Sequence, residues 1–135
     1  MGKTENMVVK LSEYKSLEYS IESVYLEIDL SLDRTKISSR FTITSNSGDT
    51  PIFFNGEDLE LKSIIVNEEP LSPKNFKVLD NGLELHVKDE EFSLEIENFI
   101  NPLENTALEG IYRSGNIYCT QCEAEGFRRI TYFPD

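Results

Sequence analysis

The chain has 135 residues, which fits one domain and leaves little room for two. Hydrophobic residues make up 39% of it, enough for a buried core, so intrinsic disorder is not the expected state. The 25 Asp and Glu residues exceed the 13 Lys and Arg residues and give a net charge of -12. Such a field repels phosphate backbones and anionic lipid, so we expect no nucleic-acid partner and no membrane partner.

The N-terminal residues carry charge, and no apolar block long enough for a signal peptide follows them. No stretch approaches the roughly 18 apolar residues of a membrane span. The chain holds only two cysteines and no Asn-x-Ser/Thr acceptor. A reducing, cytoplasmic location is therefore the expectation. Since no repeat or linker interrupts the chain, we expect residues 1–135 to form one domain.

Two strictly alternating segments dominate the first third of the chain. Apolar residues alternate with polar ones from Val24 to Leu32, and again from Ile37 to Ile43, on either side of the polar residues 33–36. A period of two residues is typical of a half-buried strand. The two segments therefore predict a long β-hairpin with the apolar parity facing the core.

Turn signals then divide the chain into short apolar runs. They stand at 46–49, 55–56, 67–69 and 81–82, and the Asn-Gly pairs among them are the strongest short signal for a hairpin. Between them lie runs at 51–54, 59–66, 76–79 and 83–87, and Phe92, Leu94 and Ile96 alternate with polar residues in a further strand. Helical periodicity is nearly absent. The pattern predicts an all-β fold with little helix, an antiparallel β-sandwich or an open, twisted double sheet.

Few residues of the chain suit metal or redox chemistry. The single histidine, His86, alternates with Leu83 and Leu85 and should face solvent. Cys119 and Cys122 have the spacing of a redox dithiol or of half a zinc site. One His and two Cys do not supply the four ligands of a structural zinc site, and the flanking residues offer no helix start that would lower a thiol pKa. We expect no metal site, and a redox or zinc module at the two cysteines remains an alternative.

The residues around these cysteines form a polar pattern of their own. If the segment is extended, Gln121, Glu123 and Glu125 point to one side, and the intervening residues point to the other. A solvated acidic strand face explains this pattern from composition alone.

The same region carries a resemblance to a known family. The stretch 108–115 and the stretch 119–133, which reads Cys-Thr-Gln-Cys-Glu-Ala-Glu-Gly-Phe-Arg-Arg-Ile-Thr-Tyr-Phe, resemble the N-terminal domain of aminopeptidase N, a gluzincin-type zinc exopeptidase, in its bacterial branch. The resemblance implies a saddle-like β-domain that precedes the catalytic domain of the same polypeptide and borders the substrate cleft. It also implies that Gln121 lines the pocket for the first side chain of a peptide substrate and that Glu123 binds the free α-ammonium group.

The chain lacks the residues that would make it a complete enzyme of this kind. It contains no His-Glu-x-x-His and no Gly-x-Met-Glu-Asn sequence. We therefore interpret it as a fragment without catalytic residues and without a cofactor of its own, and we expect zinc in the missing catalytic domain. Sheet edges left open by the missing part should allow the fragment to self-associate.

A second hypothesis belongs to a different class of protein. A stand-alone β-sandwich module that binds proteins or glycans would need a cluster of exposed aromatic side chains. Tyr14, Tyr19, Tyr25 and Phe53 are the candidates for such a cluster.

Overall fold

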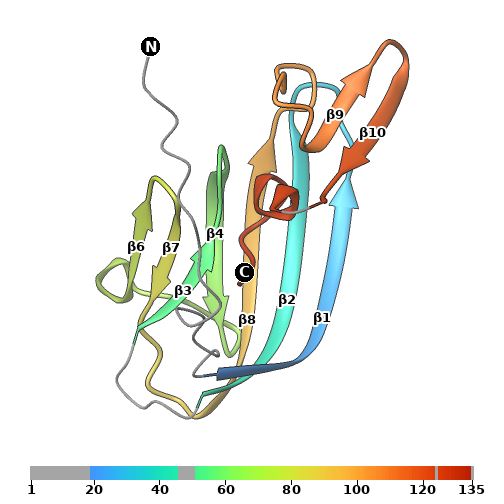
Figure 1. Ribbon diagram of the computed structural model, residues 1–135. Coiled ribbons are helices and arrows are strands. Elements are labelled where there is room, and N and C mark those ends of the chain that lie inside the picture. The colour runs from blue at the N-terminus through green and yellow to red at the C-terminus, as the bar shows by residue number, and fades with distance from the viewer. Residues whose placement is uncertain (1–18, 46–50, 124, 135) are drawn as a thin grey trace, which may run out of the picture.

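The computed structural model describes residues 19–45, 51–123 and 125–134 (Figure 1). These residues form ten β-strands and two short 3-10 helices, and they contain no α-helix. The elements are β1 (Tyr19–Asp29), β2 (Thr35–Ser45), β3 (Ile52–Asn55), β4 (Glu60–Val66), β5 (Glu69–Pro70), η2 (Pro73–Asn75), β6 (Phe76–Leu79), β7 (Gly82–Leu85), β8 (Glu91–Ile100), β9 (Gly110–Ser114), β10 (Ile117–Gln121) and η3 (Gly126–Arg129). The predicted all-β fold is confirmed.

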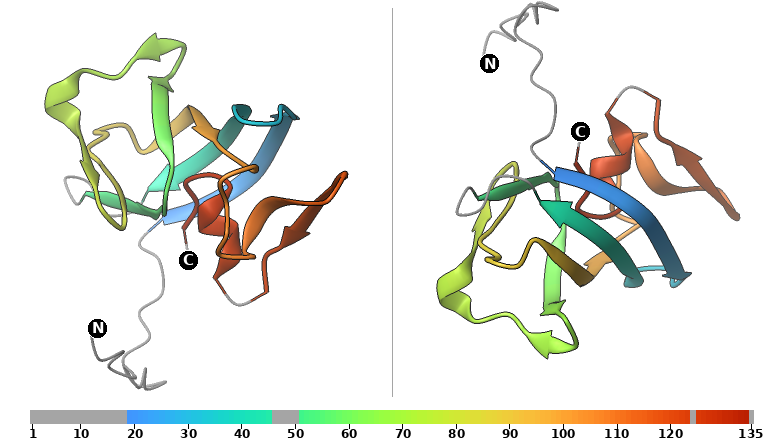
Figure 2. Two further views of the ribbon diagram at one scale, coloured as in Figure 1. Left: turned by 90° about the horizontal axis from the view of Figure 1, so that it is seen from above. Right: turned by 90° about the horizontal axis from the view of Figure 1, so that it is seen from below.

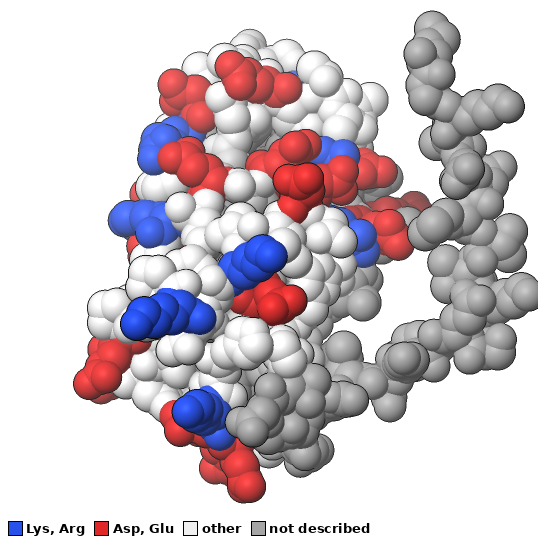
Figure 3. Space-filling view, turned by 90° about the vertical axis from the view of Figure 1, so that its left-hand side faces the viewer, with Lys and Arg blue, Asp and Glu red and all other residues white. Residues whose placement is uncertain are grey.

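The strands form three antiparallel sheets. The largest has five strands in the order β1-β2-β8-β4-β5, a second has three in the order β3-β7-β6, and β9 and β10 form a hairpin. In both Figure 1 and Figure 2 the three-stranded sheet and the β9–β10 hairpin occupy opposite ends of the molecule, and the last described residues lie between them. Figure 3 views the molecule from the side of β6 and shows basic and acidic side chains interspersed there.

Two apolar clusters make up the core. The larger one lies between the five-stranded and the three-stranded sheet, and its buried members are Tyr19, Phe41, Ile43, Ile52, Phe54, Ile64, Leu83, Leu85, Phe92, Leu94, Ile96 and Tyr132. The smaller one joins β2 and β8 to β9 and to the residue after η3, through Ile37, Ile100, Ile111 and Ile130. The inward parity predicted for β2 and β8 is therefore confirmed.

The predicted hairpin also forms, but the apolar parity of β1 is only partly buried. Ile28 pairs with Ile37 and Val24 pairs with Phe41, so these side chains share one sheet face. Phe41 is fully buried, whereas Val24 and Ile28 are 45% and 42% exposed. The predicted burial therefore fails at Val24 and Ile28, because β1 is the edge strand, and holds in part at Leu26, which is half-buried against the smaller cluster.

We expect this open edge to drive self-association of the chain. An edge strand of 11 residues with exposed apolar side chains is a template for pairing with another strand. Replacing Val24 by lysine should weaken association about tenfold or more, since it removes apolar area and adds charge at the contact. Val78→Lys, at a position that is 52% exposed on β6, is the matched control. Light scattering over a concentration series measures the effect, and a wild-type chain that stays monomeric throughout would contradict it.

The turn signals are only partly confirmed as hairpins. The tight turn with two positive φ angles is Asn67-Glu68, at +49° and +69°, between β4 and β5. Asn55-Gly56 instead carries the chain from the three-stranded to the five-stranded sheet. Glycine is needed there because a Cβ atom at Gly56 would lie 2.5 Å from the ring of Tyr132. The predicted turn at 46–49 lies outside the described residues.

Candidate functional site

The segment with the family-like motif forms a corner between β10 and η3. Strand β10 ends at Gln121, which pairs with Gly110 at the start of β9. The chain then turns through Glu123 into η3, so the segment is not extended as far as Glu125. Glu125 instead precedes η3, and its carboxylate lies 3.6 Å from the guanidinium of Arg128. The extended segment therefore ends at Gln121, and the shared side expected for Gln121, Glu123 and Glu125 in an extended chain does not apply beyond that residue.

Gln121 and Glu123 are brought together and face solvent. Both residues are exposed, whereas Cys122 between them is half-buried and packs against the smaller apolar cluster. The backbone N–H of Glu123 donates a hydrogen bond of 3.4 Å to the side-chain Oε1 of Gln121. The corner thus presents one amide and one carboxylate on the same turn of chain, and we call Gln121–Glu123 the β10 corner.

Two glycines let the backbone approach the β10 corner closely. A Cβ atom on Gly126 would lie 2.5 Å from the carbonyl oxygen of Gln121, so only glycine fits beneath the strand end. Gly110 has a φ of +76°, and a Cβ atom there would lie 2.9 Å from the Cβ of Arg129. The corner therefore rests directly on η3 and leaves no room for intervening side chains.

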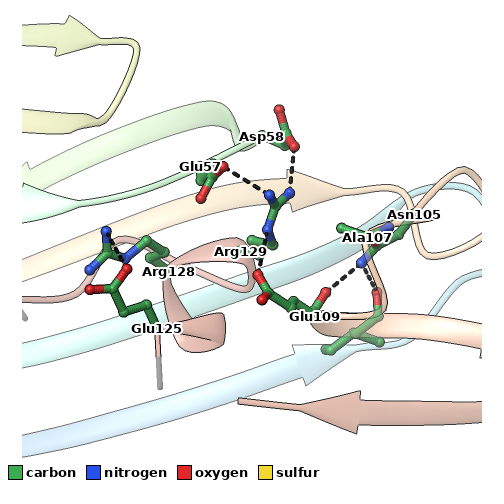
Figure 4. A network of polar contacts seen from close by, with 9 residues as sticks. Glu57, Asp58, Asn105, Ala107, Glu109, Glu125, Arg128 and Arg129 are labelled. Atoms are coloured by element: carbon green, nitrogen blue, oxygen red, sulfur yellow. Dashed lines mark hydrogen bonds and ion pairs between the residues drawn. The ribbon is translucent and has the colours of Figure 1, made fainter. Parts of the chain in front are cut away.

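Arg129, at the end of η3, holds three carboxylates (Figure 4). Its Nη2 lies 2.8 Å from Glu57, its Nη1 lies 2.7 Å from Asp58, and its Nε lies 3.2 Å from Glu109. The side chain of Arg129 is 18% exposed, so these charge-assisted bonds are partly shielded from water. The network joins the loop after β3, the residue before β9, and η3.

A buried polar pair fixes the chain just beyond η3. Asn98 stands at an inward position of β8 and is fully buried, as is Thr131. The Asn98 amide donates a hydrogen bond of 2.9 Å to the carbonyl of Ile130, and the Thr131 hydroxyl donates one of 2.7 Å to Asn98 Oδ1. No sequence pattern predicts this pair, because an asparagine at an apolar parity position looks like an interruption of the pattern.

The other candidate residues do not form a second site with the β10 corner. His86 is exposed, as its parity predicts, and lies 3.3 Å from Glu84. It lines a hollow of about 950 Å³, which includes no residue of the corner. Cys119 and Cys122 are free thiols, and burial raises the pKa of Cys122, which lowers its thiolate fraction at neutral pH. Among the described residues, no three or more His, Cys, Asp or Glu side chains gather as a metal site.

The aromatic cluster of the binding-module hypothesis is not present in the described part of the chain. Tyr19 is 8% exposed and belongs to the core, where its hydroxyl lies 3.3 Å from the carbonyl of Phe53. Phe53 is itself half-buried, and Tyr14 lies outside the described residues. That leaves Tyr25, which is 62% exposed. Within the described ranges, no helix is long and apolar enough to cross a membrane.

Comparison with known proteins identifies the family. The chain is 41% identical over 124 residues to aminopeptidase N of Escherichia coli and 41% identical over 128 residues to aminopeptidase N of Caulobacter vibrioides, in alignments that cover 91% and 94% of this chain. The chain belongs to the bacterial aminopeptidase N family and corresponds to its N-terminal region. It spans only 14% and 15% of the length of these two relatives. No family model matches the chain.

Solved structures agree with this assignment. The aminopeptidase A of Legionella pneumophila, solved in complex with aspartic acid, superposes with a TM-score of 0.83 at 30% identity over 94% of this chain and 15% of that one. An M1 zinc metallopeptidase of Deinococcus radiodurans, bound to a Tyr-Ser-Ala substrate, gives a TM-score of 0.69 at 11% identity over 86% of this chain and 29% of that one, which shows the shared fold alone. The β-domain of this chain is thus the fold found in M1 metallopeptidases.

Proposed function

We propose that this aminopeptidase N segment is a substrate-docking domain, in which Glu123 binds the free α-ammonium group of a peptide and Gln121 lines the pocket for its first side chain. The observation that carries the proposal is the β10 corner, where an exposed carboxylate and an exposed amide lie on one turn of chain backed by glycines. The sequence of this corner is also the part that resembles the family most specifically.

The chemistry of the two side chains suits the two roles. An exopeptidase must distinguish a free amino terminus from an interior amide, and a carboxylate does so through charge-assisted hydrogen bonds to the ammonium group. Such a bond contributes about 1.5–3 kcal/mol. Gln121 offers a donor and an acceptor without a second negative charge, so it can orient the peptide without competing for the ammonium group.

Peptide cleavage itself requires polypeptide outside this segment. The chain has no His-Glu-x-x-His sequence and only one histidine, so its residues do not fit a catalytic zinc ion. The relatives are about seven times longer than the matched region, so they are long enough to include a catalytic domain. We therefore place zinc and catalysis in the remainder of the full-length polypeptide, and the peptide substrate and that catalytic domain are the proposed partners.

We expect only the full-length polypeptide to cleave peptides. It should bind zinc and hydrolyse leucine p-nitroanilide, and it should leave the N-acetylated compound intact, because acetylation removes the charge that Glu123 binds. The isolated chain should hydrolyse neither compound. Release of nitroaniline, read at matched protein concentrations, measures this. Equal cleavage of both compounds by the full-length protein, or cleavage by the isolated chain, would refute the proposal.

A further inference from the structure

We propose that Arg129 is a positioning residue, whose guanidinium fixes the β10 corner against the rest of the domain and so sets where the Glu123 carboxylate lies. The inference rests on the proposed function, since it concerns the geometry of the same ammonium-binding corner. Arg129 makes three ion pairs at 2.7–3.2 Å, to Glu57, Asp58 and Glu109.

The three carboxylates come from two segments that lie against η3, and the backbone N–H of Glu57 also donates a hydrogen bond of 2.9 Å to the carbonyl of Arg128. Glu57 and Asp58 lie in the loop between β3 and β4, and Glu109 directly precedes β9. Each uses a different nitrogen of the guanidinium, Nη2, Nη1 and Nε respectively. A planar fork with fixed donor directions can serve three acceptors at once, which a lysine ammonium on a flexible stem does less well. Without the cation the three carboxylates would repel one another.

The segment that carries Glu109 is tied by three hydrogen bonds of the Asn105 side chain, so the ion pair to Arg129 has a bonded anchor. The side-chain amide of Asn105 donates hydrogen bonds to the carbonyls of Glu109 and Ile111, at 2.7 and 2.9 Å. Its Oδ1 accepts a hydrogen bond of 3.1 Å from the backbone N–H of Ala107. Figure 4 shows Asn105 next to Glu109, on the side of the network opposite Glu57.

Close backbone contacts then connect Arg129 to the β10 corner. Arg129 packs against Gly110, and Gly110 is the strand partner of Gln121. Gly126, at the other end of η3, packs under the carbonyl of Gln121. Because both contacts are to glycines, no side chain can adjust its rotamer to absorb a shift of η3. A displacement at Arg129 is therefore passed on to Gln121 and to Glu123, which follows it.

The decisive experiment replaces Arg129 by glutamine, with Arg129→Lys as the conservative variant and Arg40→Gln as the matched control. Arg40 makes an ion pair of 2.6 Å to Glu95 but is 63% exposed and belongs to β2. In the full-length polypeptide we expect Arg129→Gln to raise KM for free-amino substrates about tenfold, the scale expected for displacement of a binding group, with partial rescue in Arg129→Lys. Arg40→Gln should leave KM unchanged. An Arg129→Gln enzyme with the KM of wild type would overturn the inference.

A second readout separates this inference from the proposed function. In amide NMR spectra of the chain, Arg129→Gln should shift the Gln121 and Glu123 signals, and Arg40→Gln should not. If Glu123→Ala leaves KM unchanged, the proposed role of Glu123 fails, and the NMR shifts still decide whether Arg129 positions the corner. If Arg129→Gln does not fold, Glu109→Gln takes its place, since it removes one of three ion pairs and keeps the cation. Unshifted signals of the corner in that variant would refute the inference.

Discussion

Replacing Glu123 by alanine in the full-length polypeptide is expected to raise KM for peptides with a free amino terminus by about 10- to 150-fold, which corresponds to the loss of about 1.5–3 kcal/mol from a charge-assisted hydrogen bond. Glu123 is exposed and packs against no core cluster, so the change should not affect folding. Zinc content should stay at the wild-type value, because the chain holds no ligand set for the metal. Steady-state kinetics with metal analysis measures both quantities.

Glu125→Ala is the matched control for this variant. Glu125 is an exposed carboxylate two residues further along, and it faces Arg128 at 3.6 Å. An exposed ion pair of this kind contributes little to stability, so its removal should change KM less than twofold. If both variants raise KM equally, the general negative charge of the region attracts the substrate and Glu123 has no specific role. If neither does, the ammonium group is bound elsewhere.

The sequence predicts where the strands lie better than it predicts which of their faces are buried. Alternation identified β2 and β8, where Ile37 and Leu94 are buried as expected, because both strands lie inside the five-stranded sheet. The same alternation in β1 leaves Val24 exposed, since burial depends on what packs over a strand. A pattern within one strand carries no information about its covering layer.

The candidate site is also only partly predictable from the sequence. The resemblance drew attention to Gln121 and Glu123, and the structure places them on one turn. The support beneath them was not predictable, because Arg129 and its three carboxylates are separated by up to 72 residues in sequence. Long-range ion pairs leave no periodic pattern in the sequence, so only the folded structure shows which residues form them. The predicted roles of Gln121 and Glu123 themselves stay predictions until the kinetic tests are made.

The buried pair of Asn98 and Thr131 is expected to be a large contributor to stability. Asn98→Leu keeps the side-chain size but leaves the Ile130 carbonyl and the Thr131 hydroxyl buried without their partner. Each of the two unsatisfied buried groups costs about 1–3 kcal/mol, so the free energy of unfolding should fall by about 2–6 kcal/mol. Asn116→Leu, at an exposed position between β9 and β10, should change it by less than about 0.5 kcal/mol. Urea unfolding followed by circular dichroism compares the variants.

The double variant Asn98→Leu/Thr131→Val shows whether the two hydrogen bonds act as one unit. Valine removes the hydroxyl that Asn98→Leu leaves unpaired, so the double variant should lose less stability than the two single variants together. Additive losses would mean that the bond between the two side chains contributes nothing on its own. Since Ile130 and Thr131 directly follow η3, the same pair also holds the end of the support on which the β10 corner rests. A coupled loss of stability would therefore show that the bond between Asn98 and Thr131 itself holds the chain directly after η3.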